Sequence, residues 1–384
     1  MTAPVTAGDR QPTAIVLAEH GYAELMFWYP VLRLRELGAA VTVLGPDAEE
    51  TYRSPLGYPV IPDAALAAAA GAPADLLVVP GGEAGRRLSR SAAAGQLIRE
   101  HLAAGSVVAI TGAPDELAAI TGDDAEEHGQ PGAGTVLAIP APDDLTSLIP
   151  AALGAAAVAA GEHLRGARVV VLAESQYQEL ELWYPVLRFR EAGAEVVVAS
   201  PAAGALYASK IGYPVRSDVS VDQVDPGEID ALVIPGGFAP EAMRRSQPLL
   251  DLVRKTYESG TIVAAICHAG WVLVSAGIAR GRHLTCVPII KDDLLSAGAD
   301  YTDQAVVRDG NLITSRLPND LPDFCAQISA ALAEPERRRA GGTPWSLAGV
   351  PRQSTATYTV AAAIGMAPGG KASANYRNIS VPAS

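Results

Sequence analysis

The sequence has little cysteine. Its 384 residues include only three, Cys267, Cys286 and Cys325, an odd number with no CxxC pair. Such a count argues against a disulfide scaffold and a cysteine-rich metal site. It favours the reduced thiols of a cytoplasmic protein.

Positive charge is also scarce. The 29 lysines and arginines stand against 42 aspartates and glutamates, for a net charge of -13 at pH 7. A field of this sign repels phosphate backbones and anionic lipids, so we expect a small-molecule substrate and neither nucleic acid nor a membrane as partner. Every apolar run is interrupted before it reaches about 18 residues, the length needed to cross a membrane. The first residues also lack the positive charge followed by an apolar run that is typical of a signal peptide. We therefore expect no membrane span and no export.

An internal repeat organises the chain. The run AELMFWYPVLRLRELGAAVTVLGP from Ala23 returns as QELELWYPVLRFREAGAEVVVASP from Gln178, at an offset of about 155 residues. With 49% apolar residues, each copy can bury its own core. We predict a flexible start over 1–12, repeat one over 13–161, repeat two over 167–334, and a Pro-, Gly- and Ala-rich tail over 335–384 that is flexible or wraps the surface.

Each repeat predicts a doubly wound sheet. Aliphatic runs over 14–17 and 169–172 are typical of parallel strands buried on both faces. A helical pattern follows each run and ends near Gly38 or Gly193, and further aliphatic runs continue the alternation. With right-handed crossovers, this order predicts an α/β fold of two tandem domains.

The strongest candidate for chemistry is Cys267, in TIVAAICHAGWVLVSAG. The pattern indicates a strand, a sharp turn and a helix, and the small residues Ala269 and Gly270 suit a cramped nucleophile elbow. The helix start is expected to lower the pKa of the thiol. Repeat one has SVVAITGAPDELAAITG here, so Thr111 or Gly112 replaces the cysteine, depending on a one-residue gap. We predict that repeat one is catalytically empty.

A second loop, VIPGGF, is expected beside this elbow at the carboxyl edge of the sheet. Gly236 and Gly237 let the backbone come close, and with the amide of His268 they predict an oxyanion hole. The His268 ring is either a general base, if a carboxylate orients it, or a packing residue.

The acid or base is predicted to be Glu181, in QELELWYP. Met26 stands at its position in repeat one, so the carboxyl and the thiol are lost together. A carboxyl that faces an apolar sheet edge should have a raised pKa and exchange protons with the thiolate. The alternative is a solvated glutamate at a helix start, which is our interpretation of Glu179. Cys286 and Cys325 are interpreted as small buried residues.

Repeat two, over about 167–333, contains ELELWYP, a GYPV turn, DALVIPGG, AICHAG, IKDDLLSAGA and VVRDGNLITSR. Together these motifs resemble the PfpI-like branch of the DJ-1/ThiJ/PfpI superfamily. Repeat one resembles the same fold without its active site, so the chain is similar to a tandem duplication with a degenerate first repeat.

The resemblance implies two flavodoxin-like domains of the class I glutamine-amidotransferase-like kind. It implies Cys267 as nucleophile, Glu181 as its protonated partner, and Gly237 and His268 as oxyanion donors, with no cofactor and no metal. It further implies an internal pseudo-dimer of the two repeats and leaves a homo-oligomer open. Gln178, where relatives often have an acid, and Val287, where they often have a ring, are departures that bear on substrate choice.

The resemblance leaves the reaction open, since such relatives include glyoxalases, deglycases, peptidases, isonitrile hydratases and chaperones. The leading hypothesis is a cofactor-free, cysteine-dependent enzyme acting on a small reactive carbonyl, like a glyoxalase III or deglycase. One alternative is a PfpI-type hydrolase or hydratase of a peptide, an isonitrile or a specialised metabolite, using Cys267 and His268. Another is a thiol redox sensor or chaperone. A glutamine amidotransferase is excluded because no His-x-Glu follows His268.

Overall fold

The chain forms two compact units in the computed structural model, which describes residues 11–69, 73–112, 134–153, 163–334 and 345–356. Unit 1 comprises residues 1–54 and 59–141, and unit 2 comprises residues 55–58 and 142–384. The predicted boundary at 161–167 divides the sequence repeats, whereas the packing divides the chain before Pro142. A short piece of repeat one, 55–58, therefore packs with repeat two.

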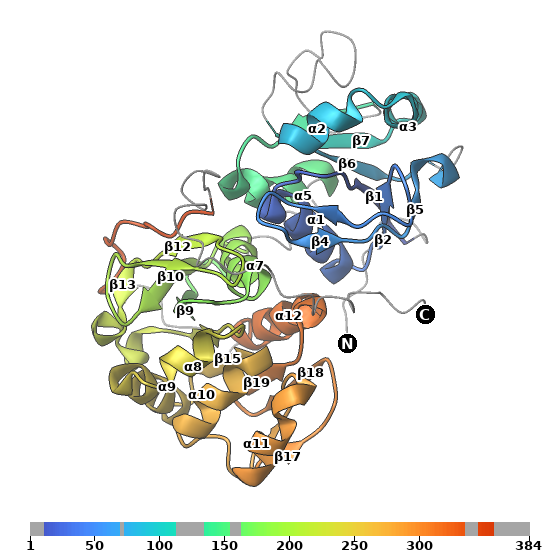
Figure 1. Ribbon diagram of the computed structural model, residues 1–384. Helices are drawn as coiled ribbons and strands as arrows, with labels where there is room; N and C mark the ends of the chain where they lie inside the picture. Colours follow the sequence, from blue (N-terminus) through green and yellow to red (C-terminus); the bar gives the residue numbers. More distant parts are fainter. Residues whose placement is uncertain (1–10, 70–72, 113–133, 154–162, 335–344, 357–384) are drawn as a thin grey trace. The chain divides into compact units, whose positions relative to one another are not determined.

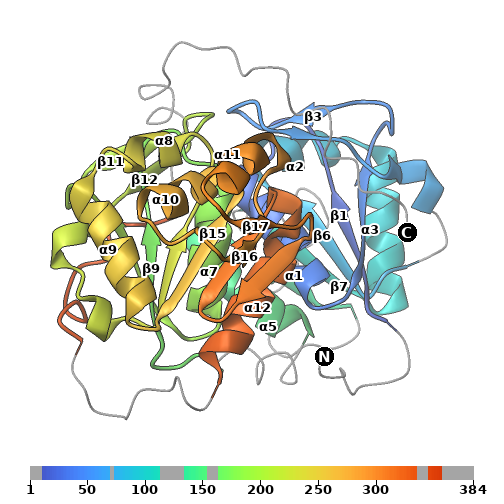
Figure 2. The same ribbon diagram turned by 90° about the horizontal axis from the view of Figure 1, so that it is seen from below.

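Unit 1 is built on a parallel sheet. Its described residues form six strands in the order β5-β2-β1-β6-β7-β8, and each neighbouring pair is parallel. The helices α1 and α3 cover opposite faces of this sheet (Figures 1 and 2). The elements of unit 1 are β1 (Thr13–Leu17), α1 (Glu24–Glu36), β2 (Ala40–Gly45), β3 (Tyr52–Arg53), β4 (Pro59–Val60), β5 (Ala64–Ala65), η1 (Leu66–Ala69), β6 (Leu76–Pro80), α2 (Gly82–Leu88), α3 (Ala92–Ala104), β7 (Val107–Thr111) and β8 (Val136–Ala138).

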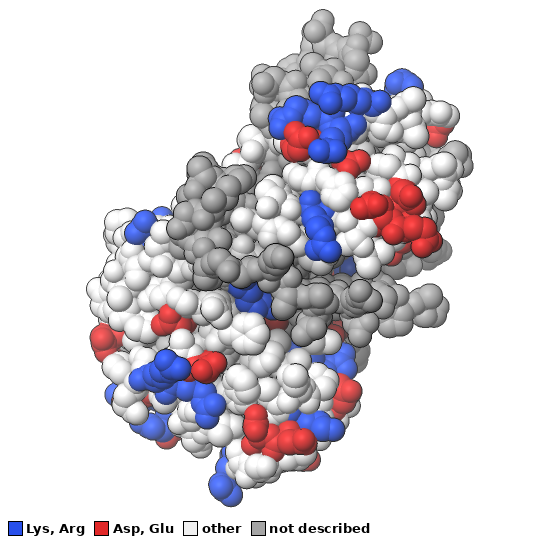
Figure 3. All heavy atoms as spheres, in the orientation of Figure 1, with Lys and Arg blue, Asp and Glu red and all other residues white. Residues whose placement is uncertain are grey.

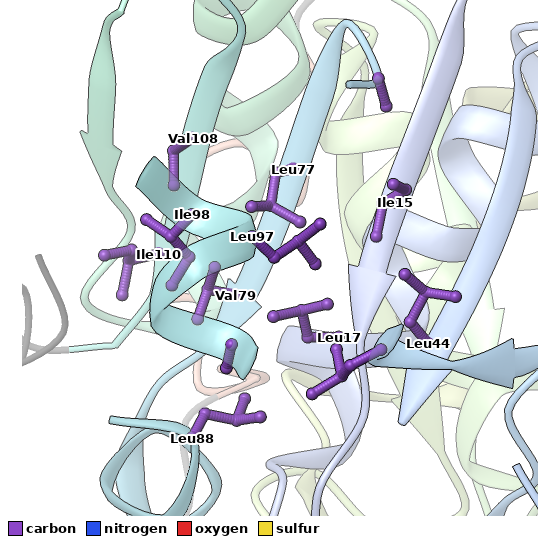
Figure 4. Packing of buried hydrophobic residues seen from close by; sticks show 13 residues of the cluster. Ile15, Leu17, Leu44, Leu77, Val79, Leu88, Leu97, Ile98, Val108 and Ile110 are labelled. Atoms are coloured by element: carbon purple, nitrogen blue, oxygen red, sulfur yellow. The ribbon is translucent and has the colours of Figure 1, made fainter. Parts of the chain in front are cut away.

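The core of unit 1 includes the layer between the sheet and α3. Figure 4 shows Leu97 and Ile98 of α3 beside Val79 of β6 and Ile110 of β7. These four side chains are at most 3% exposed. Burial of such a side chain contributes roughly 1.5–3 kcal/mol. Repeat one therefore keeps a packed core even though it has no cysteine.

Unit 2 repeats this architecture with one strand more. Within the described residues its sheet has the order β13-β10-β9-β14-β15-β19-β18, parallel except for the β18–β19 pair. The helices α7 and α12 lie on one face and α9 lies on the other (Figure 2). The strand order reverses between β9 and β14, and ligands of doubly wound folds bind at the carboxyl ends of strands at such a point.

The elements of unit 2 are the following in chain order: η2 (Pro142–Asp144), α5 (Leu145–Leu153), β9 (Arg168–Leu172), α7 (Glu179–Glu191), β10 (Glu195–Ser200), β11 (Leu206–Ala208), β12 (Pro214–Arg216), β13 (Val219–Ser220), η3 (Val221–Gln223), η4 (Pro226–Glu228), β14 (Ala231–Ile234), α8 (Ala239–Met243), α9 (Gln247–Glu258), β15 (Ile262–Ile266), η5 (Cys267–Ala269), α10 (Gly270–Ser275), β16 (His283–Leu284), η6 (Pro288–Ile290), α11 (Lys291–Ser296), β17 (Asp300–Tyr301), β18 (Val306–Asp309), β19 (Leu312–Ser315), η7 (Pro318–Asp320) and α12 (Leu321–Leu332). Both units thus have the flavodoxin-like doubly wound topology that the sequence predicts.

Part of the C-terminal tail, 345–356, lies against unit 2. The Ser354 side chain is fully buried. Its hydroxyl donates to Asp218 Oδ2 at 2.7 Å and accepts from Arg190 Nη2 at 2.8 Å. This part of the tail therefore wraps the surface, while the rest of it, 335–344 and 357–384, falls outside the described residues.

The surface of unit 2 carries charges of both signs. Figure 3 shows lysines and arginines next to aspartates and glutamates on the face that it draws. The exposed pair Arg245–Glu241 and the partly buried pair Arg254–Asp251 are examples, and surface pairs of this kind contribute little to stability. Across the described ranges, no helix has the length and apolar character needed to cross a bilayer.

Candidate active site

Cys267 lies at the turn between β15 and α10, as the first residue of η5. Its φ of 62° is in the left-handed region, which a residue with a side chain adopts only at a cost. A small residue is needed shortly afterwards, because a Cβ on Gly270 would lie 3.0 Å from Leu294. The Cys267 side chain is 7% exposed. This is the strained geometry of a nucleophile elbow.

The loop after β14 closes on this elbow. A Cβ on Gly236 would lie 2.6 Å from Glu181 Oε2 and 2.7 Å from Cys267 Cβ, so only glycine fits. Gly237 has a φ of 75°, and a Cβ there would lie 2.5 Å from the carbonyl oxygen of Gln176. The two glycines therefore let the loop approach both the thiol and the carboxyl.

Glu181 lies on the first turn of α7 and is fully buried. Its Oε2 accepts a hydrogen bond from the Gly236 N–H at 2.8 Å, and its Oε1 accepts none from the residues that the structure describes. Burial raises the pKa of Glu181 to about 7, although the charge of Lys210 and the Gly236 amide act in the opposite direction. The carboxyl therefore exchanges its proton near neutrality, which agrees with the direction predicted from the sequence.

The pKa of the Cys267 thiol differs from the prediction. Burial raises the pKa of Cys267, and the Glu181 carboxylate raises it further. The charge of Lys210 and the amides of His268 and Gly237 oppose this rise. The expectation that the helix start lowers the thiol pKa is therefore wrong for the resting protein, because the elbow is shielded from water.

The predicted oxyanion donors separate into two kinds. The amides of Gly237 and His268 both donate toward the sulfur of Cys267, so they lie beside the place where the oxyanion of an attacked carbonyl would form. The Gly236 amide instead donates to Glu181. Gly236 thus serves the site through its missing Cβ and its bond to the carboxyl, and it is not placed to bind an oxyanion.

The His268 ring faces the thiol. Its Nδ1 lies 3.2 Å from Cys267 Sγ. The centroid of its ring lies 6.1 Å from that of Phe238 and 5.3 Å from that of Trp271. Burial and the charge of Lys210 lower its pKa to about 4, so the ring is neutral at pH 7. No carboxylate among the described residues hydrogen-bonds to the ring.

Sequence reasoning missed Lys210, in the loop between β11 and β12. Its Nζ lies 6.0 Å from the centroid of the Phe238 ring. Its charge lowers the pKa of both Glu181 and Cys267. A signal was present in the sequence, because Pro55 stands at the corresponding position of repeat one. The lysine is thus lost together with the thiol and the carboxyl.

Glu179 is fully buried, so its interpretation as a solvated glutamate is wrong. Its Oε1 accepts a hydrogen bond from the Ile211 N–H at 3.2 Å, in the same loop as Lys210. Burial raises the pKa of Glu179, and the charge of Lys210 opposes the rise. Two buried carboxyls therefore begin α7. In the described part of the chain, no group of three or more His, Cys, Asp or Glu side chains could hold a metal ion.

The strand register settles which residue of repeat one replaces the cysteine. Val79 pairs with Ile110 in unit 1, and the residues 155 positions later, Ile234 and Ala265, pair in unit 2. The two repeats therefore align here without a gap, and Gly112 is the counterpart of Cys267. A glycine offers no nucleophile at that position.

A flavodoxin-like unit with a cysteine on its elbow and a buried carboxyl beside it defines a class of cysteine-dependent α/β proteins. The chain belongs to the DJ-1/PfpI family, whose model matches residues 12–125 and 167–331. Because the match is split in two, both repeats carry the family fold.

Several known proteins are similar to part of the chain. A deglycase of Pyrococcus abyssi is 46% identical over 154 residues, which are 40% of this chain and 92% of the relative. Protein/nucleic acid deglycase 2 of Escherichia coli is 41% identical over 159 residues, 41% of this chain and 92% of the relative. A solved two-domain protein of Anabaena variabilis, with DJ-1/ThiJ/PfpI-like and ferritin-like domains, is 39% identical, covers 43% of this chain and 48% of its own, and has a TM-score of 0.43. Each match has about the length of one repeat.

Proposed function

We propose that the protein is a cysteine-dependent enzyme that acts on a small reactive carbonyl, with the chemistry of a glyoxalase or deglycase. The observation that carries the proposal is the adjacency of Cys267 and Glu181, which both lie within 2.7 Å of the Cβ position that Gly236 leaves empty. A thiol beside a carboxyl that titrates near pH 7 is suited to addition followed by proton transfer. The deglycases of Pyrococcus abyssi and Escherichia coli support the same direction.

The first step is addition of sulfur to the aldehyde carbon. Cys267 Sγ forms a bond to that carbon, the thiol proton passes to the Glu181 carboxylate, and the π electrons of the carbonyl move to its oxygen. The amides of Gly237 and His268 stabilise the negative oxygen. Glu181 then returns the proton to the oxygen, which gives a hemithioacetal.

With a 2-oxoaldehyde such as methylglyoxal, the second step moves a hydrogen between carbons. The Glu181 carboxylate removes the proton from the carbon bonded to sulfur, an enediol forms, and the proton returns to the neighbouring carbon. The product is a thioester of a 2-hydroxy acid, and water releases the acid and the Cys267 thiol. One carbon is oxidised and its neighbour is reduced, so the balance requires water and no external oxidant.

Turnover of methylglyoxal by three variants tests the proposal. We expect Cys267→Ser and Glu181→Gln to lose activity by about a hundredfold or more, because each removes a reacting group. The matched control is Cys325→Ala, which removes another buried thiol, from α12. It should keep the wild-type rate. A Cys267→Ser protein as active as the wild type would overturn the proposal.

A second candidate is a PfpI-type hydrolase or hydratase, which the 3.2 Å separation of Cys267 Sγ and His268 Nδ1 favours. Its general base would be His268, whose pKa of about 4 makes the ring a weak base at neutral pH. Replacement of His268 by alanine separates the candidates, since hydrolysis depends on the ring and isomerisation by Glu181 does not.

A redox sensor has less support, because burial raises the pKa of Cys267 and so lowers the thiolate fraction that oxidants attack. Cys267, Cys286 and Cys325 form no disulfide. Reduced thiols are typical of the cytoplasm, which is the location we propose.

A further inference from the structure

The residue before α7, Gln178, holds the start of the helix that carries Glu181. Its Oε1 accepts a hydrogen bond from the Glu181 N–H at 2.8 Å, as an N-cap does. Its Nε2 donates to Tyr58 Oη at 3.1 Å. The Gln178 and Tyr58 side chains are 2% and 1% exposed, so water does not replace either partner. A chain of two hydrogen bonds thus runs from Tyr58 to the backbone of Glu181.

Tyr58 comes from the repeat that has no nucleophile. It lies in repeat one by sequence, yet residues 55–58 pack with unit 2. Repeat one cannot form the same chain of two hydrogen bonds. Ala23 stands at the position of Gln178 in repeat one and has no amide to donate. Tyr213, the counterpart of Tyr58, donates its hydroxyl to the carbonyl of Ala356 instead.

The hydroxyl at this position has a defined physical effect. The Glu181 N–H can bond only to the oxygen of the Gln178 amide, so the amide nitrogen must face Tyr58. A buried amide nitrogen without an acceptor is unfavourable, so loss of the hydroxyl would release the Gln178 side chain from the helix start. Glu181 is then held at one end only, where its Oε2 accepts from Gly236.

We propose that Tyr58 is a positioning residue for Glu181, acting through Gln178, so that the degenerate repeat supplies a part of the active unit. The inference rests on the proposed function in one respect, which is that catalysis requires the Glu181 carboxyl to be held in place. The contact itself does not require any particular substrate. It also assigns a use to Gln178, since a neutral amide can bridge Tyr58 and Glu181 without adding a third negative charge beside Glu179 and Glu181.

The test is a titration of the Glu181 carboxyl carbon by NMR in full-length protein labelled with carbon-13 at glutamate side chains. Its signal is identified by its absence from Glu181→Gln. We expect the Tyr58→Phe variant to titrate roughly 0.4–1 pH unit higher than the wild type, because a loosened carboxyl loses the Gly236 hydrogen bond while burial persists. Gln178→Met, which breaks the same link from its other side, should give the same shift.

The double variant Tyr58→Phe/Gln178→Met should shift no further than Gln178→Met alone, because both changes interrupt one path. Tyr213→Phe is the matched control, since it removes a buried hydroxyl that donates to the Ala356 carbonyl. It should titrate like the wild type.

An unshifted Tyr58→Phe, shifts that add in the double variant, or an equal shift in Tyr213→Phe would each overturn the proposal. If Tyr58→Phe fails to fold, Tyr58→Leu, which also lacks the hydroxyl, takes its place with the same expected shift. The titration uses no substrate, so an enzyme inactive on carbonyls would sink the proposed function and leave this result standing.

Discussion

Replacement of Glu181 by glutamine should make the protein less active and, at alkaline pH, more stable. Glutamine keeps an oxygen that can accept the Gly236 N–H and has nearly the shape of the glutamate. It cannot ionise, however, so it avoids the unfavourable burial of a negative charge. The wild-type carboxyl bears that cost whenever it is deprotonated, because its side chain is fully buried.

The size and sign of the effect follow from the pKa of Glu181, which burial raises from 4.5 to about 7. Between these values the folded state holds a proton that the unfolded state has released. The contribution of Glu181 to stability is therefore full below pH 4.5 and is lost as the pH rises through 7. At about 1.36 kcal/mol per pH unit, the loss is about 3 kcal/mol. The Glu181→Gln variant does not incur it.

Equilibrium urea unfolding, followed by tryptophan fluorescence, measures this difference at about pH 5 and about pH 8.5. We expect the variant to gain about 2.5 kcal/mol on the wild type between the two conditions, because a small part of the loss has already occurred at pH 5. Glu258→Gln, which removes an exposed carboxyl from the end of α9, should gain nothing. If Glu181→Gln and the wild type showed the same pH dependence, the buried-charge reasoning would be refuted.

Two further predictions concern the surroundings of the thiol. Gly236→Ala places a methyl group 2.6 Å from Glu181 Oε2. It should therefore lower turnover roughly a hundredfold and lower stability, measured by thermal melting, by about 1–3 kcal/mol. The control is Gly349→Ala, where a Cβ meets open space, and it should change neither turnover nor the melting temperature. Lys210→Met removes a charge that lowers the pKa of Glu181, so the pH–rate profile should move to higher pH, and an unmoved profile would argue against this role.

Much of the fold can be predicted from the sequence, because its signals are local. The glycines predicted to end the first helix of each repeat, Gly38 and Gly193, have φ values of 78° and 82° just beyond the helix ends. The aliphatic runs predicted as buried strands form β1 and β9 inside their sheets. Cys267 and Glu181 are also found in the sequence, because the degenerate repeat lacks both together.

The features of the site that the sequence does not predict depend on which segments, distant in the chain, pack together. The burial of Glu179 cannot be read from its position at a helix start, since the loop that covers it arrives from about 30 residues further along the chain. The packing of Tyr58 in unit 2 has no signal in the repeat pattern at all. The direction of the thiol pKa was mispredicted for the same reason, because the helix start is a local feature and the exclusion of water is not.

The charges of the site explain how a thiol with a raised pKa can still react. Glu179, Glu181 and Cys267 are buried acids that share the influence of one cation, Lys210, whose charge lowers the pKa of each. Three negative charges beside one positive charge would be strongly unfavourable away from water, so the group retains protons at rest. In the proposed reaction, attack by sulfur would move negative charge out of this group onto the substrate oxygen, beside the amides of Gly237 and His268. On this proposal the Cys267 thiol loses its proton only as a carbonyl substrate accepts the negative charge.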